Sequence, residues 1–344
     1  MTTQVGRDPA TTAAVEEFLN RPTTPAQRVQ HILHKQPALS PALVLVLACI
    51  VFSLLSSRFY TLTNVSVLLQ QVAVVGSLAV GQTLIILTAG IDLSIGAVAV
   101  LSAVVMSKLA LNSGVPGLLA LVIGVAVAVG AGALNGFLVT KVKLPPFIVT
   151  LGTLSIFTAI TLIYAQGNTF TLTSNFLLWT GDTVSMGNLQ ITAGVVLMLV
   201  LYAVFGFALR YTAWGRHVYA VGDDAEAARL AGIQVNRVLL SVYIAAGIAV
   251  AVGAWILVGR VGGGDPNSAA NANLQSITAV VIGGTSLFGG RGVVLGSLIG
   301  ALIVQVFVNG LALTPYDPSY QVMAVGVLVV AAVSVDQWIR SVRA

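Results

Sequence analysis

The sequence predicts an all-α membrane protein that crosses the bilayer about ten times. Hydrophobic residues make up 57% of the 344 residues, and only 8% are charged, whereas about a quarter of a soluble domain is charged. Apolar runs long enough to span a bilayer recur along the chain, and the mean hydropathy is +0.97. The 35 glycines fit this class, because small residues let membrane helices approach closely. We also expect some helices to be broken at glycine-rich stretches.

The chain divides into a polar start, an apolar body and a short tail. Residues 1–40 have no apolar run long enough to insert, so they predict a cytoplasmic extension without a signal peptide. Residues 41–336 form the predicted transmembrane domain and 337–344 a cytoplasmic tail. The segment 274–290 is short for a span and is interrupted by Gly283 and Gly284. The predicted spans are 41–57, 64–89, 93–111, 116–139, 146–165, 191–209, 237–258, 274–290, 293–312 and 321–336.

The distribution of basic residues orients these spans, because loops on the cytoplasmic side carry an excess of Lys and Arg. With ten spans and the N-terminus inside, thirteen of the sixteen basic residues lie inside. The other three, Arg58, Lys108 and Arg260, lie outside. Without the span 274–290, the C-terminal Arg340 and Arg343 would move outside. The sequence therefore predicts that both termini are cytoplasmic, with a long outer loop at 166–190 and a long inner loop at 210–236.

The inner loop contains a charged, alanine-rich stretch, "GDDAEAARLAGI", at 222–233. Asp223 is the predicted N-cap of a helix of about two turns, with Glu226 reaching back as in a capping box. Glu226 and Arg229 can pair at i,i+3, and Gly232 is placed for a left-handed C-terminal cap. The stretch predicts either a docking helix for another protein or a linker helix lying on its own bundle. Its expected exposed face is formed by Ala227, Ala228 and Ala231.

The sequence around this stretch, "TAWGRHVYAVGDDAEAARLAGIQVNR", resembles the cytoplasmic loop of ribose/fructose/xylose-type permeases of bacterial ABC sugar importers. Further resemblance lies in "GQTLIILTAGIDLSIGA", "KLPPFIVTLGT", "ITAVVIGGTSLFGGRGVVLGSLIGAL" and "DQWIR", in the order found in that family. The resemblance implies a permease subunit in the bacterial inner membrane that forms a pore with a second copy. Its other implied partners are a cytoplasmic ATPase, which binds the ATP and Mg, and a periplasmic or lipoprotein sugar-binding protein. The chain itself is expected to bind no cofactor and no nucleic acid.

The resemblance also gives the charged loop a role, as the coupling helix that sits in a groove of the ATPase. Fructose is the sugar that it suggests first, with ribose and mannose as further candidates. A self-sufficient secondary sugar transporter or facilitator remains the alternative. The implied coupling residues are Gly222, Asp223, Asp224, Glu226, Ala227, Ala228, Arg229 and Gly232.

Polar residues within or beside spans are candidates for the sugar path or its gate. Asp92 and Ser94, in "GIDLSIG", stand where the next helix begins. They predict an N-cap or structural polar contact, a role in the path, or ion coupling. Gln82 and Asn135 could hydrogen-bond a sugar or a neighbouring helix.

The glycine-rich stretch "VIGGTSLFGGRG" is not a phosphate-binding loop, because a Walker A motif requires Gly-Lys-Ser/Thr and no lysine here follows a glycine. The chain is therefore expected to be a pore-forming subunit, not an enzyme, that takes its energy from elsewhere. The stretch predicts either a broken helix lining a polar cavity or a tight turn between helices. The residues concerned are Gly283, Gly284, Thr285 and Ser286.

Glycines at a spacing of four predict close helix packing, either within the chain or between subunits. The three histidines lack the acidic or cysteine neighbours of a metal site, so none is expected. The predicted packing positions are Gly132, Gly136, Gly292, Gly296 and Gly300.

Overall fold

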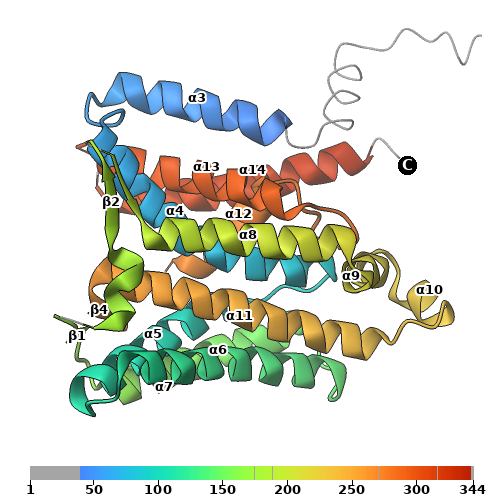
Figure 1. Ribbon diagram of the computed structural model, residues 1–344. Helices are drawn as coiled ribbons and strands as arrows, with labels where there is room; N and C mark the ends of the chain where they lie inside the picture. Colours follow the sequence, from blue (N-terminus) through green and yellow to red (C-terminus); the bar gives the residue numbers. More distant parts are fainter. Residues whose placement is uncertain (1–38, 174, 188, 270, 316, 342–344) are drawn as a thin grey trace, which may run out of the picture.

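The computed structural model describes residues 39–341 except residues 174, 188, 270 and 316. This part of the chain is a helical bundle (Figure 1), which confirms the predicted all-α class. The predicted N-terminal extension lies almost entirely outside the described residues. The helices are α3 (Leu39–Leu55), α4 (Leu62–Leu87), α5 (Ile95–Asn112), α6 (Gly117–Thr140), α7 (Pro146–Ala165), α8 (Ala193–Tyr211), α9 (Ala213–Asp223), α10 (Ala225–Leu230), α11 (Val235–Val261), α12 (Ala272–Ile282), α13 (Val294–Ala312) and α14 (Ser319–Ser341).

Each of the ten predicted spans overlaps one of the apolar helices, and these helices differ in length. Within the described residues, seven helices are long and apolar enough to cross a membrane: α4, α5, α6, α7, α8, α11 and α13. The apolar parts of α3, α12 and α14 are shorter. The predicted span 274–290 is wrong in its extent, because α12 ends at Ile282. Its 11 residues correspond to about 16 Å, roughly half the thickness of a hydrocarbon core.

The two long loops lie at opposite ends of the bundle (Figure 1). One end carries a 3-10 helix, Phe176–Gly181, and two small antiparallel sheets that the sequence did not predict. The first sheet pairs β1 (Phe170–Thr171) with β4 (Gly263–Gly264), and the second pairs β2 (Thr183–Met186) with β3 (Leu189–Thr192). The other end carries α9 and α10, and α3 begins and α14 ends on that side.

Helix α11 lies at the centre of the bundle and packs most extensively against α6 and α4. Two of the predicted packing glycines create the contact with α6. A Cβ at Gly132 would lie 2.5 Å from the carbonyl oxygen of Tyr243, and one at Gly136 would lie 2.9 Å from the Tyr243 Cβ. These glycines therefore mediate packing within the chain.

Helices α12 and α13 form a hairpin in which glycines again set the separation. A Cβ at Gly296 or Gly300 would overlap the carbonyl oxygen of Gly283 or Ala279, respectively. Gly292, however, precedes α13 and has a φ of 150°, so its predicted place in a helix-packing motif is wrong. It belongs to the non-helical segment that joins the two helices.

Candidate functional site

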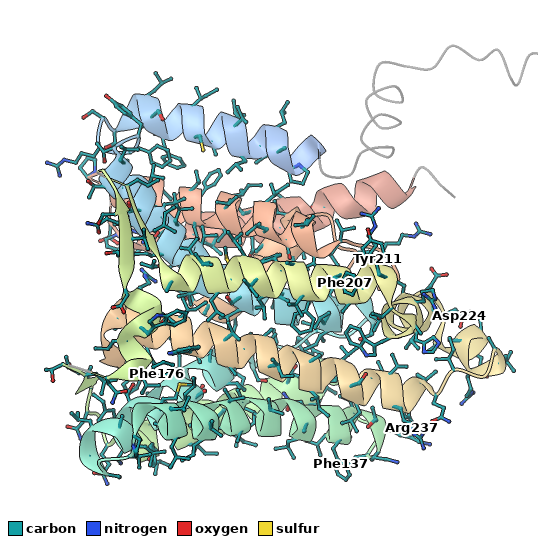
Figure 2. All side chains as sticks on the ribbon, viewed as in Figure 1. Phe137, Phe176, Phe207, Tyr211, Asp224 and Arg237 are labelled. Carbon is teal, nitrogen blue, oxygen red and sulfur yellow. The ribbon has the colours of Figure 1, made fainter. Side chains whose placement is uncertain are left out.

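The short helix α10 is stabilised by the residue that precedes it, the N-cap Asp224. A helix of six residues is only marginally stable by itself. The carboxylate of Asp224 accepts hydrogen bonds from the backbone N–H groups of Glu226, at 2.8 Å, and Ala227, at 3.0 Å. The prediction that Asp223 caps the helix is wrong, because Asp223 is the last residue of α9. The sharp bend between the two helices places the following aspartate at the cap. Figure 2 shows Asp224 where the chain passes from α9 to α10.

The rest of α10 follows the sequence prediction. Arg229 donates a hydrogen bond to Glu226 and forms the predicted ion pair, which raises the pKa of the Arg229 guanidinium. Gly232 has a φ of 84°, the left-handed conformation expected just after the helix. Both charged side chains are about two-thirds exposed, so their pairing stabilises the helix only slightly.

Asp224→Ala is expected to loosen α10 without unfolding the bundle. Losing an N-cap of this kind costs about 1 kcal/mol, which corresponds to roughly fivefold faster amide hydrogen exchange in the helix. Exchange of the amides of residues 225–230 measures this. Asp223→Ala is the matched control, because no hydrogen bond to the Asp223 carboxylate is found among the described residues. Equal exchange in the two variants would contradict the assignment of the cap.

Two of the predicted coupling residues are not available to a partner, because they are buried in this chain. Ala228 is 5% exposed and packs in the core, so the predicted exposed alanine face is wrong at that position. Gly222 is also buried. The remaining predicted coupling residues are exposed, together with Leu230, which is 82% exposed and which the sequence analysis missed.

Gly222 is buried because the end of α9 presses against two other backbone segments. A Cβ at Gly222 would overlap the carbonyl oxygen of Leu87, at the end of α4, and would lie 2.7 Å from the amide nitrogen of Gly290. The N–H of Gly290 donates a 3.0 Å hydrogen bond to that same carbonyl of Leu87. We call this meeting point of residues 219–223, 87–89 and 289–292 the backbone junction.

A side chain of α9 also contacts the glycine-rich segment at the backbone junction. The Tyr219 hydroxyl donates a 2.8 Å hydrogen bond to the carbonyl of Gly292, and burial raises the pKa of this hydroxyl. Ala89 lies in the same place with a φ of 59°, an uncommon conformation for a residue other than glycine. The charged loop is thus joined directly to the segments that follow α4 and α12.

The segment after α4 leads from the backbone junction to the start of α5, and three other helices hold it. Thr150 on α7 donates a 3.0 Å hydrogen bond to the carbonyl of Ile91. Asn273 on α12 accepts a hydrogen bond from the N–H of Gly96, in the first turn of α5. Asn135 on α6 contacts Asp92 and Ser94. A displacement of this segment would therefore disturb its contacts with α5, α6, α7 and α12.

The prediction that Asp92 and Ser94 make a structural polar contact is supported by their geometry. Asp92 accepts hydrogen bonds from the Ser94 N–H, at 2.7 Å, and from the Ser94 hydroxyl, at 2.6 Å. Asn135 donates to the Ser94 hydroxyl oxygen at 2.9 Å and to Asp92 at 3.4 Å. Ser94 occupies the N-cap position of α5 but its side chain makes no capping hydrogen bond.

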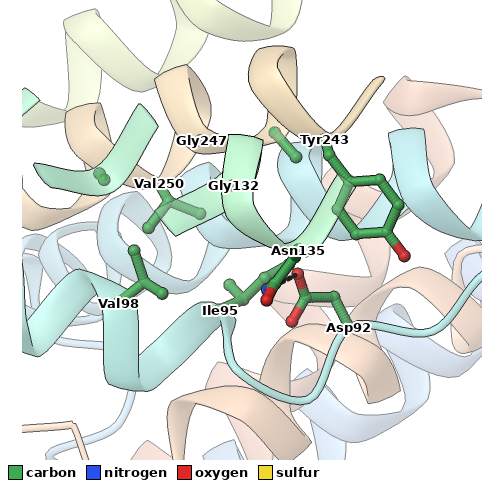
Figure 3. Close-up of a pocket in the computed structure, with 10 residues that line it drawn as sticks. Asp92, Ile95, Val98, Gly132, Asn135, Tyr243, Gly247 and Val250 are labelled. Atoms are coloured by element: carbon green, nitrogen blue, oxygen red, sulfur yellow. Dashed lines mark hydrogen bonds between the residues drawn. The ribbon is translucent and has the colours of Figure 1, made fainter. Parts of the chain in front are cut away.

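A small cavity adjoins this cluster, between α5, α6 and α11 (Figure 3). Its lining includes Asp92, Asn135 and Tyr243. The side-chain oxygen of Asn135 and the hydroxyl of Tyr243 are buried and have no hydrogen-bond partner among the described residues. The cavity measures about 10 Å³, which is close to the minimum that one water requires. In this conformation it therefore suits one buried water, and a monosaccharide does not fit.

The other predicted path residues lie apart from this cavity. Gln82 is completely buried in α4, and neither polar atom of its side chain has a partner in the described part of the chain. The stretch 283–293 forms the turn of the α12–α13 hairpin, and the Ser286 N–H donates to the carbonyl of Arg291 at 2.8 Å. Their role in a path stays a prediction. Among the described residues no group of three potential metal ligands occurs.

Tyr243, Tyr219 and Asn273 were not predicted as site residues. Tyr243 and Asn273 each place a polar group within an apolar helix, which is a feature of the sequence that indicates a functional or structural contact. The contact of Tyr219 with Gly292 joins residues 73 positions apart, and no local pattern indicates it.

Comparison with known proteins identifies similar permeases that cover most of the chain. Residues 64–333 match the family described as "Branched-chain amino acid transport system / permease component". The fructose import permease protein FrcC of Rhizobium meliloti is 46% identical over 96% of this chain and 93% of its own length. The ribose import permease protein RbsC of Bacillus subtilis is 38% identical over 87% of this chain and 92% of its own. The D-allose transport system permease protein AlsC of Escherichia coli is 33% identical over 86% and 90%, respectively.

No solved structure matches the chain. The residues matched by the family model, 64–333, include the loop that carries α10. The chain therefore belongs to the permease components of transport systems described by that family.

Proposed function

We propose that this chain is the membrane-spanning subunit of an ATP-driven importer that carries a monosaccharide, with fructose as the first candidate and ribose and mannose next. The named relatives are import or transport permeases for fructose, ribose and allose. The chain works in the bacterial inner membrane, with both termini in the cytoplasm and a second copy completing the pore. A separate ATPase binds ATP and Mg, and a periplasmic or lipoprotein sugar-binding protein delivers the sugar.

The observation that carries this proposal is the connection between an exposed helix and the interior of the bundle. α10 presents charged side chains and Leu230 to the outside, a combination that suits a groove on a partner protein. The preceding helix, α9, ends in the backbone junction. Movement of α10 with the ATPase would therefore displace the end of α4 and the glycine-rich turn that follows α12.

Reconstitution tests the proposal, with the chain in vesicles together with its candidate ATPase and sugar-binding protein. Uptake of labelled fructose and ribose is measured with and without ATP. The proposal requires uptake that depends on ATP and on both partners. Sugar movement by the chain alone, indifferent to ATP, would instead establish a secondary transporter or facilitator.

Glu226→Lys is expected to lower ATP-driven uptake at least about tenfold in this system, because it reverses a charge in the proposed ATPase contact. The midpoint of thermal unfolding should change little, since the exposed pair with Arg229 stabilises the chain only slightly. Asp182→Lys also replaces an exposed acid with lysine, between the 3-10 helix and β2 and outside α10, and should leave uptake unchanged. An equal loss in both variants would contradict a specific contact at α10.

A further inference from the structure

A second, larger depression lies between α12, α13 and α14. Its seven lining residues are all uncharged. Three are carboxamides, Asn271 and Gln275 on or beside α12 and Gln321 on α14, and the others are apolar. We call it the amide groove. We propose that the amide groove is a binding subsite for the monosaccharide in transit. This inference rests on the proposed function, because it names where the sugar is contacted.

The amide groove does not suit contact with lipid. Asn271 is exposed and Gln275 and Gln321 are half-buried, so their polar groups reach the surface of the bundle where α12 and α14 begin and α13 ends. Polar groups are costly within a membrane unless they face a protein neighbour or a water-filled cavity. Among the described residues, the side chains of Asn271 and Gln321 have no hydrogen-bond partner. The simplest arrangement is that this face lines a water-filled path.

The chemistry of the lining selects a neutral, polyhydroxylated ligand. A carboxamide offers two donors and an acceptor, which matches a sugar hydroxyl in either role. With no charged residue in the lining, neither an anion nor a cation has a counter-charge there. The apolar neighbours Leu274, Val308 and Val325 offer surface for the C–H groups of a sugar ring.

One of the three carboxamides, that of Gln275, is held by a hydrogen bond from a buried side chain of α13. Gln305 on α13 is 3% exposed and donates a 3.1 Å hydrogen bond to the side-chain oxygen of Gln275. This bond fixes the orientation of the carboxamide, and the NH2 group of Gln275 can then donate to a ligand. Gln305 is therefore a positioning residue for the amide groove.

The amide groove is also linked to the segment that the backbone junction controls. Asn273, two residues after Asn271, accepts a hydrogen bond from the N–H of Gly96 at the start of α5. The other end of α12 enters the glycine-rich turn, whose Gly290 contacts Leu87. A change at the junction can thus reposition α12, and with it two of the three carboxamides.

Cysteine labelling tests whether the amide groove is open to water. In a Cys49→Ser background, which removes the one native cysteine, Gln321→Cys is compared with Val327→Cys. Val327 lies on the same helix and is 61% exposed, outside the amide groove. In the assembled complex in vesicles, a charged methanethiosulfonate reagent should modify Gln321→Cys at least about tenfold faster, because the thiolate is the reactive form and requires water. Equal rates would overturn the proposal.

Transport tests whether the sugar uses the amide groove. The double variant Gln275→Leu with Gln321→Leu removes hydrogen bonds while keeping similar volume. Uptake of labelled fructose should fall at least about fivefold, while stimulation of ATP hydrolysis by the loaded binding protein persists. Gln190→Leu makes the same change on an exposed residue of β3 and should transport normally.

Unchanged uptake in the double variant would overturn the subsite. A wild-type complex without ATP-dependent uptake would instead overturn the proposed function, and the labelling rates would then still show whether the amide groove faces water. If the leucine variant fails to assemble, which loss of the ATPase stimulation reports, the labelling comparison decides.

Discussion

Gly222→Ala is expected to reduce ATP-driven uptake at least about tenfold, although it adds only one methyl group. The new Cβ would overlap the carbonyl oxygen of Leu87 and lie 2.7 Å from the nitrogen of Gly290. Both neighbours are backbone atoms, so neither can rotate away as a side chain would. Overpacking of this kind costs about 1–3 kcal/mol. The relief available is to separate α9 from α4 and from the glycine-rich turn, which weakens the connection of α10 to these two segments.

Two measurements on the reconstituted complex check this expectation: sugar uptake, and stimulation of ATP hydrolysis by the loaded binding protein. Gly206→Ala in α8 is the matched control, because nothing lies within 4 Å of a Cβ built there. We expect the control to behave like the wild type in both measurements. Normal uptake by Gly222→Ala would show that the backbone junction does not transmit movement.

Asp92→Ala is expected to have the second largest effect, because it removes the acceptor of a buried cluster. The N–H and hydroxyl of Ser94 both donate to Asp92, and Asn135 also contacts it. Leaving such donors buried without a partner costs roughly 3 kcal/mol in total. The midpoint of thermal unfolding in detergent should fall, and uptake should fall with it at least about tenfold.

The variant Asp92→Asn tests whether Asp92 acts through its hydrogen bonds or through its negative charge. The asparagine keeps an oxygen that can accept from Ser94, so we expect uptake within about threefold of the wild type. A well-folded Asp92→Asn protein without transport would contradict the structural role and favour ion coupling. Asp182→Ala removes an exposed acid in the predicted outer loop and is the control for the loss of a negative charge.

Much of the fold could be predicted from the sequence, because a membrane helix can be recognised from a local run of apolar residues. Each predicted span overlaps a helix, and Gly132, Gly136, Gly296 and Gly300 lie at close helix contacts as predicted. The span at 274–290 was predicted too long, because apolar residues such as Leu287 continue past the glycines that end α12. The four short strands were missed because their pairing occurs between segments of two to four residues.

The candidate site was less predictable, since its contacts join distant parts of the chain. Which of two adjacent aspartates caps α10 depends on the bend that ends α9 at Asp223. The burial of Gly222 depends on Leu87 and Gly290, and no local spacing relates these positions. The amide groove combines residues from three helices, so composition could indicate the carboxamides but not their meeting.

The backbone junction has a consequence for the construction of chimeric importers. Its fit is made by main-chain atoms and by the absence of side chains at Gly222, Gly289 and Gly290. If only the loop 213–233 were replaced by that of a relative, its backbone would have to fit the two other segments of the junction, which would still come from this chain. A working hybrid should require the loop, residues 85–92 and residues 283–293 to be transplanted together, so these three stretches form one interchangeable module.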